Sequence, residues 1–242
     1  MKIFYYYHIP KTGGTSTDHF LDYLSKNVPN SIFYNFNTHP RVIPKDIDFN
    51  ELLSKENIKK YDYIFIHHHH GYYGLMHYEN ILIEKKRELE INGHKMIIFT
   101  TIRDVLSFNN SRVNFMKKTK SDFLTNQIHW NCQTKYFYFC HHGPNPKGEI
   151  TIDVINNELT EGNILRLSNV IDIFIETKNL TKFIDTMSKY FNLNYDSSKR
   201  KNECKYSIDF EDNYDELLNN NKFDCFLLKT FKNDENHEFN IL

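Results

Sequence analysis

A short turn near the N-terminus carries the residue types best suited to hold an anion. Residues 8–16 read HIPKTGGTS. The paired glycines Gly13 and Gly14 let a backbone fold tightly enough for successive amide N–H groups to converge on one point. A helix that begins there adds the positive end of its dipole, and Lys11 adds a full positive charge. The hydroxyl groups that could complete such an anion site belong to Thr12, Thr15 and Ser16.

Two other interpretations of this turn are open. In a plain strand–helix turn, Thr15 or Ser16 would only cap the helix. In a P-loop nucleotide kinase or phosphotransferase the lysine follows the last glycine, whereas Lys11 precedes both glycines. Such a kinase would also need a group to hold Mg²⁺, and Arg103 rather than a lone aspartate follows the third apolar run. The residues therefore favour an anion loop that works without a metal nucleotide.

A second candidate anion site follows the apolar run MIIFTTI at residues 96–102. Arg103 and Asp104 come next, and Ser111 stands eight residues after the arginine. An arginine at a strand end offers a two-pronged donor to phosphate, and a serine two helical turns later returns to nearly the same face. The alternative is a local ion pair between Arg103 and Asp104, with Ser111 on an ordinary helix surface.

Four consecutive histidines, residues 67–70, follow the apolar run YDYIFI and precede GYYG. Neighbours in an extended chain point to opposite faces, so only alternate histidines could share one ion. No CxxH or HExxH pattern completes a ligand set. We therefore expect no metal, and we keep a non-enzymatic nucleotide-binding or metal-binding module as the alternative.

These motifs resemble those of the PAPS-dependent sulfotransferases, where PAPS is 3′-phosphoadenosine 5′-phosphosulfate. PKTGGTS is similar to the 5′-phosphosulfate loop in the PKTGGT form of the carbohydrate and bacterial branches. Arg103 and Ser111 match the family's second motif, whose arginine and serine hold the 3′-phosphate. This sequence departs from that motif at Val105, where proline is usual, and at Phe108, where a second arginine is common.

The resemblance implies a donor, an acceptor and residue roles. It implies PAPS as the donor, PAP as the product, no metal, and an acceptor hydroxyl or nitrogen on a small-molecule metabolite or a sugar. Lys11 would stabilise the leaving oxygen, and the segment HHGYYG at residues 69–74 resembles the family region that supplies a general base. His70 is the first choice for that base and His68 the second, while His67 and His69 are expected to pack. A late basic run would be solvated or would reach the 3′-phosphate, and its members are Lys199, Arg200 and Lys201.

Apolar runs alternate with amphipathic stretches along the chain, which predicts an α/β fold. We expect a P-loop-like, mainly parallel sheet with helices on both faces, as in the sulfotransferase fold, within one domain spanning residues 1–242. Ligands of such sheets bind at the carboxyl ends of the strands. Aromatic residues between Ser121 and Lys147 are candidates for a wall against the acceptor. The expected strands cover residues 3–9, 61–67, 95–102 and 170–175, and the expected helices begin near residues 16, 81, 105, 121, 180 and 214.

Composition narrows the class of partner. The 242 residues carry 30 Lys and Arg against 31 Asp and Glu, so no overall positive charge favours nucleic acid. No stretch reaches the roughly 20 apolar residues that cross a bilayer, and the first residues lack the pattern of a signal peptide. The four cysteines are widely spaced, which is typical of reduced thiols. We therefore expect a cytoplasmic protein without membrane or nucleic-acid partners.

Overall fold

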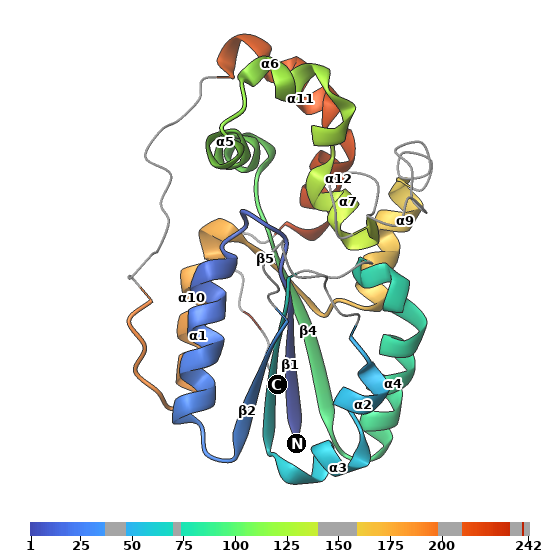
Figure 1. The fold of residues 1–242 in the computed structure, drawn as a ribbon, viewed down its shortest axis with the longest axis vertical. Coiled ribbons are helices and arrows are strands. Elements are labelled where there is room, and N and C mark those ends of the chain that lie inside the picture. The colour runs from blue at the N-terminus through green and yellow to red at the C-terminus, as the bar shows by residue number, and fades with distance from the viewer. Residues whose placement is uncertain (37–46, 70–73, 140–158, 198–209, 233–238, 240–242) are drawn as a thin grey trace.

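A parallel five-stranded sheet forms the centre of the molecule. The computed structural model describes residues 1–36, 47–69, 74–139, 159–197, 210–232 and 239. Within them the strand order is β2-β3-β1-β4-β5, and every neighbouring pair is parallel (Figure 1). The strands are β1 (Lys2–Tyr7), β2 (Ser31–Phe36), β3 (Tyr63–His68), β4 (Lys95–Ile102) and β5 (Ile173–Glu176).

Helices cover both faces of this sheet, which confirms the expected α/β class. Among the described helices none is both long and apolar enough to cross a bilayer. Short 3₁₀ turns lie at residues 75–78, 127–129, 167–169, 177–179 and 211–213. The α-helices are α1 (Gly14–Asn27), α2 (Phe49–Leu52), α3 (Lys55–Lys60), α4 (Glu79–Ile91), α5 (Val105–Met116), α6 (Lys120–Thr125), α7 (Cys132–Phe139), α9 (Glu161–Arg166), α10 (Leu180–Tyr190), α11 (Tyr214–Asn220) and α12 (Lys222–Phe231).

Strand β1 shows why its sequence is apolar or aromatic at every position after Lys2. Its side chains alternate between two cores, with Tyr5 in one and Tyr6 in the other. Both faces of a central parallel strand are covered, so neither set can be polar. Helices α1 and α10 pack on the Tyr6 face, and α2 and α4 pack on the Tyr5 face (Figure 1).

A layer of helices lies beyond the carboxyl ends of the strands. Figure 1 shows α5, α6, α7, α11 and α12 gathered there, past the tips of β1 and β4. A third apolar cluster holds part of this layer together, with Val113 of α5 against Phe123 of α6 and Leu217 of α11. The layer therefore stands over the edge of the sheet where ligands of such folds bind.

The structure corrects two expected helices and adds a strand. The helix expected over residues 121–139 is broken between α6 and α7, where the Asn126 side chain accepts from the backbone of Ile128 and Asn131 has a positive φ of 50°. The helix expected from Tyr214 divides at Asn221, whose side chain accepts from the Asn131 backbone. Both breaks have the same cause, because asparagine side chains that bond to backbone groups compete with a continuous helix. Strand β2 was not expected, because it is an edge strand and is only partly buried.

Candidate functional site

The turn after β1 lies at the point where the order of the strands reverses. Strands β2 and β3 lie on one side of β1, and the later strands β4 and β5 lie on the other side. In open α/β sheets this switch point, at the carboxyl ends of the strands, is where ligands bind. Residues 8–13 fill it and lead directly into α1.

The backbone of this turn has the geometry of an anion site. Gly13 has a left-handed conformation with φ 100°, and the right-handed first turn of α1 follows it. That succession gathers consecutive N–H groups into a concave surface. The N-cap residue Gly13 has no side chain to cap α1, and the first turn of the helix contains no acidic residue. The first amides of α1 therefore present both hydrogen-bond donors and the positive end of the helix dipole.

Three hydroxyl groups anchor the turn to the sheet. The Thr12 hydroxyl is fully buried and donates to the Ile9 carbonyl oxygen at 2.6 Å. Its oxygen lies 2.7 Å from Thr101 Oγ1, which lies 2.7 Å from the Tyr6 hydroxyl. Because Thr12 donates to Ile9, Thr101 must donate to Thr12, and Tyr6 to Thr101. Burial raises the pKa of Tyr6 to about 12, which keeps this donor protonated. The Thr12 side chain is thus structural, and its carbonyl oxygen accepts from the Thr177 hydroxyl at 3.1 Å.

Both glycines are required by close neighbours. A methyl group on Gly13 would lie 2.7 Å from Cδ2 of Leu180, in addition to straining the positive φ. A methyl group on Gly14 would lie 1.7 Å from Nε2 of His8, inside the imidazole ring. The His8 ring therefore packs directly on the first residue of α1. Sequence analysis did not single out His8, because its neighbour is set by the fold of the turn.

Arg103 joins the second motif to the first. Its Nη1 donates to the carbonyl oxygen of Lys11 at 3.2 Å. Its backbone is held by the buried side chain of Gln133, whose Oε1 accepts from Arg103 N at 2.8 Å and whose Nε2 donates to Arg103 O at 2.8 Å. Gln133 is a functional candidate that sequence analysis missed. It lies 30 residues away, and nothing in its local pattern indicates the contact.

The N-terminus of α7 is in turn fixed by Asp224 of α12. The Asp224 carboxylate accepts from the backbone N of Gln133 at 3.2 Å, and from the backbone N and hydroxyl of Thr134 at 2.8 and 2.7 Å. Burial raises the pKa of Asp224, while the hydrogen bonds from Thr134 and Gln133 oppose that rise. A row of contacts thus runs from α12 through α7 to Arg103.

The start of α5 tolerates the departures from the family motif. The Asp104 side chain accepts from the Ser107 backbone at 2.8 Å, so it is the N-cap of the helix. Val105 takes the first helical position, where proline is favoured but not required. Phe108 is buried in the core and therefore cannot stand in for an exposed arginine. Ser111 lies on the same helix and is also buried.

The Lys11 side chain reaches toward the end of α5. Its Nζ lies 4.0 Å from the ring centroid of Phe115, a ring that is 71% exposed. Lys11 itself has a positive φ of 69°, which is costly for a residue with a Cβ. Such strained residues cluster at functional sites. Lys11 and Arg103 thus place two cations at the carboxyl edge of β1 and β4.

The described histidines divide by parity, as expected. His67 stacks on Tyr6 and lies on the α1 face, whereas Nδ1 of His68 lies 2.6 Å from the Tyr5 hydroxyl on the opposite face. His69 stacks on His8 and so shares the face of His67. His68, the second choice for the base, is only 1% exposed.

His67 does more than pack. Its Nδ1 lies 2.8 Å from Oδ1 of Asp18, and its Nε2 lies 3.1 Å from Nδ1 of His8. This hydrogen-bonded row ends at the turn that contains Gly13 and Gly14. The first choice for the base, His70, lies outside the described residues, as do Lys199, Arg200 and Lys201.

The aromatic wall expected after Ser121 is corrected in part. Tyr136 and Phe137 are buried in the main core and cannot line an acceptor site. His129 is stacked on Phe123, with ring centroids 4.3 Å apart. Burial, followed by the charge of Arg112, lowers the pKa of His129 to about 4. His129 and Phe123 thus pack within the helical layer.

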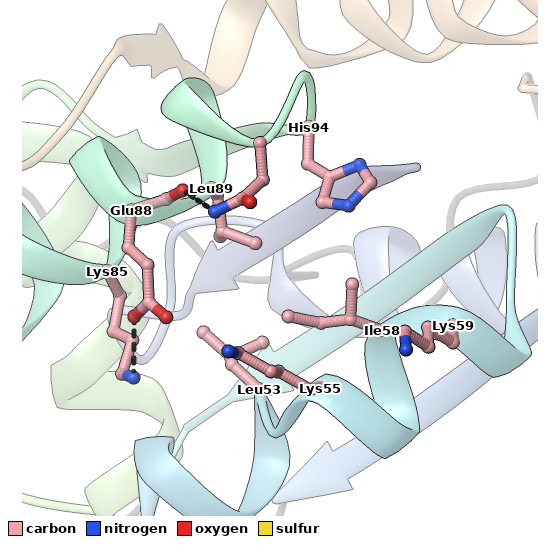
Figure 2. A pocket seen from close by; sticks show the side chains of 9 residues that line it. Leu53, Lys55, Ile58, Lys59, Lys85, Glu88, Leu89 and His94 are labelled. Atoms are coloured by element: carbon pink, nitrogen blue, oxygen red, sulfur yellow. Dashed lines mark hydrogen bonds and ion pairs between the residues drawn. The ribbon is translucent and has the colours of Figure 1, made fainter.

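A cavity at the other end of the sheet does not extend the site. It has a volume of about 270 Å³ and lies between α3 and α4 (Figure 2). Its lining includes Leu53, Lys59 and His94, and His94 immediately precedes β4. The cavity therefore lies at the amino ends of the strands, opposite the turn after β1.

Comparison with family models finds no match for this chain, and comparison with curated proteins finds none either. The described residues contain no group of three or more His, Cys, Asp or Glu side chains placed to hold a metal ion. The functional interpretation therefore depends on the motifs and on the geometry of the turn after β1.

Proposed function

We propose that this chain is a PAPS-dependent sulfotransferase that moves a sulfuryl group to a hydroxyl or nitrogen of a small-molecule metabolite or sugar. The observation that carries the proposal is the hydrogen bond from Arg103 Nη1 to the Lys11 carbonyl oxygen, 3.2 Å long. It joins the two motifs that resemble the family's 5′-phosphosulfate and 3′-phosphate sites. A donor with phosphates at both positions would need both motifs at one place.

The turn after β1 has the chemistry that the 5′ end of this donor needs. The first-turn amides of α1 and the positive end of its dipole suit a phosphate group. As the bond from sulfur to the bridging oxygen breaks, negative charge grows on that oxygen, and Lys11 would stabilise it. Sulfuryl transfer resembles phosphoryl transfer in depending on placement and charge neutralisation. The acceptor proton would go to a histidine, for which the motif favours His70 and then His68.

The second motif supplies the preference for PAPS over ordinary nucleotides. Arg103 is held at its backbone by Gln133, so its guanidinium is aimed by a fixed element. A guanidinium matches phosphate with two parallel donors. The net charge of −1 gives no overall attraction for a nucleic acid, so we propose a small acceptor.

Calorimetric titration of PAP and AMP tests the proposal. We expect PAP to bind at least 10-fold more tightly than AMP, because only PAP carries the 3′-phosphate that Arg103 would contact. Arg103→Ala should remove most of this preference, whereas Arg87→Ala, an exposed arginine on α4, should keep it. Equal affinities of the unmodified protein for PAP and AMP would overturn the assignment. A rise in melting temperature with Mg-ATP and none with PAP would favour the kinase alternative.

A further inference from the structure

The cavity between α3 and α4 is lined by more positive than negative side chains. Its lining contains three lysines, Lys55, Lys59 and Lys85, and a single carboxylate, that of Glu88. With histidine counted as neutral, three positive charges and one negative charge leave a local charge of +2, whereas the whole chain carries −1. A local surplus of positive charge on a nearly neutral protein attracts anions to that place.

The Glu88 carboxylate does not neutralise the lysines of α3. Its Oε2 accepts from Nζ of Lys85, on the same helix, at 2.9 Å. This hydrogen bond and the charge of Lys85 lower the pKa of Glu88, and the charge of Lys55 lowers it further to a smaller extent. Neither Lys55 nor Lys59 forms an ion pair with a carboxylate of the described residues. Two ammonium groups on α3 are therefore available to an anion.

The same cavity has an apolar wall made by Leu53, Ile58 and Leu89. Leu53 and Leu89 are buried members of the main core, and Ile58 packs against that core while it is only partly buried. Because these side chains are held by the packing of the core, the wall is formed before any ligand arrives. An apolar group that binds there leaves water, which favours binding.

The size of the cavity and the type of its cations limit the ligand. Figure 2 shows Lys85 and Glu88 on the α4 side of the cavity and Lys55 on the α3 side. The volume of about 270 Å³ is below the range of sites that hold drug-sized molecules, so the ligand must be small. A lysine ammonium is a compact charge without the planar fork of arginine, so it binds a carboxylate and a sulfate ester by the same contact.

We propose that this cavity is a second ligand site, which binds a small organic anion with one charged head group and a short apolar body. The head group contacts the ammonium groups of Lys55 and Lys59. The body lies against the wall made by Leu53, Ile58 and Leu89. Carboxylates and sulfate esters share this chemistry. The inference does not rest on the proposed function, because the cavity lies at the amino ends of the strands, opposite the turn after β1.

Titration of the ¹⁵N-labelled protein, followed by amide NMR shifts, tests this site with four matched probes. Hexanoate and hexyl sulfate carry the two kinds of head group on the same body, hexan-1-ol lacks the charge, and inorganic sulfate lacks the body. We expect the two organic anions to shift the amides of residues 53–59 and 85–94 with a Kd of about 1 mM or below. Hexan-1-ol and inorganic sulfate should each bind about 10-fold more weakly, because each makes only one of the two contacts. The tighter of the two anions identifies the kind of head group that the site prefers.

Removal of the two lysine charges locates the head group. In the double variant Lys55→Gln and Lys59→Gln, hexanoate should bind about 10-fold more weakly, while the affinity for hexan-1-ol stays the same. Lys60→Gln is the matched control, since Lys60 ends the same helix and does not line the cavity, and it should keep the full affinity for hexanoate. Equal affinities of the unmodified protein for hexanoate and hexan-1-ol, or for hexyl sulfate and inorganic sulfate, would overturn the proposal. So would shifts confined to residues 11–17, which would place the anion at the turn after β1, or an equal loss of affinity in Lys60→Gln and the double variant.

Discussion

Lys11 combines a functional charge with an unfavourable backbone. Its φ of 69° lies in the left-handed region, which costs a residue with a Cβ about 1–2 kcal/mol. The hydroxyl chain from Tyr6 to Thr12 and the hydrogen bond from Arg103 hold the turn in this conformation. A glycine would adopt it without strain, so the presence of lysine points to a role for its side chain rather than for its backbone.

Substitution of Lys11 separates these two contributions. We expect Lys11→Gly to raise the free energy of unfolding by about 0.5–1 kcal/mol, because the left-handed conformation is relaxed. The same change should lower turnover by about three orders of magnitude, because the leaving oxygen loses its cation. Lys117→Gly is the matched control, since Lys117 also has a positive φ, 53°, at the end of α5. It should stabilise the protein similarly and keep full turnover. Normal turnover of Lys11→Gly would mean that the turn is only structural.

At the residue scale, the sequence could identify the turn but not the distant residues that hold it in place. Lys11, Gly13 and Gly14 lie close together in the sequence, and this local motif predicts an anion site. The partners that define the site, Asp18 and Gln133, are 49 residues from His67 and 30 residues from Arg103. Their roles come from tertiary contacts, which no local pattern records. The same holds for His8, whose reason for facing Gly14 is the shape of the folded turn.

At the element scale, the helical layer links its own packing to the second motif. Asp224 of α12 fixes the first residues of α7. Gln133 of α7 then bonds to both the backbone N–H and the carbonyl oxygen of Arg103. Sequence analysis expected one helix through residues 121–139, whereas the structure breaks it near Asn131, two residues before Gln133. Asn131 is itself tied to α12, because its Oδ1 accepts from the Phe223 backbone at 2.8 Å. The periodic pattern of apolar residues continues across this break, which is why periodicity alone gave a single helix.

The same layer should make stability depend on pH. His129 has its pKa lowered from the ordinary 6.5 to about 4, first by burial and then by Arg112, whose Nη2 lies 3.3 Å from His129 Nδ1. Between pH 6.5 and pH 4 the unfolded chain binds a proton that the folded chain excludes, so stability falls as pH falls through this window. By pH 4.5 we expect the free energy of unfolding to have fallen by about 2 kcal/mol on this account.

Urea unfolding at pH 7 and pH 4.5 measures the contribution of His129. His129→Gln removes the ionisable group. Between the two pH values, the free energy of unfolding of this variant should therefore fall by about 2 kcal/mol less than that of the unmodified protein. His19→Gln, which removes an exposed histidine from α1, should keep the full loss. An identical pH dependence for His129→Gln and the unmodified protein would show that other groups cause the acid sensitivity.

At the scale of the whole molecule, the sheet and the helical layer meet at the candidate site. The turn after β1 is anchored by Ile9 in one of the two cores that flank the sheet, whereas α5 and α6 are held largely by a third apolar cluster. Arg103 stands between them, bonded to Lys11 on one side and to Gln133 on the other. The parallel sheet was predictable because β1, β3 and β4 each contain a run of apolar and aromatic residues. The helices of the layer above it were expected too, but their breaks were not, because these depend on side-chain contacts of Asn126 and Asn221 with the backbone of Ile128 and Asn131.

This arrangement predicts how ligands should spread protection through the molecule. A nucleotide that engages only the turn after β1 should slow amide hydrogen exchange in residues 11–17 and leave the helical layer unchanged. PAP should engage the turn and also Arg103, so it should slow exchange in α5 and at the N-terminus of α7 as well. Hydrogen–deuterium exchange with saturating AMP and with saturating PAP compares the two patterns at equal occupancy. In Gln133→Ala, PAP should still protect the turn but protect α7 much less, whereas Gln127→Ala, an exposed glutamine beside α7, should match the unmodified protein. Protection by PAP that is confined to residues 11–17 would mean that the second motif does not contact the ligand.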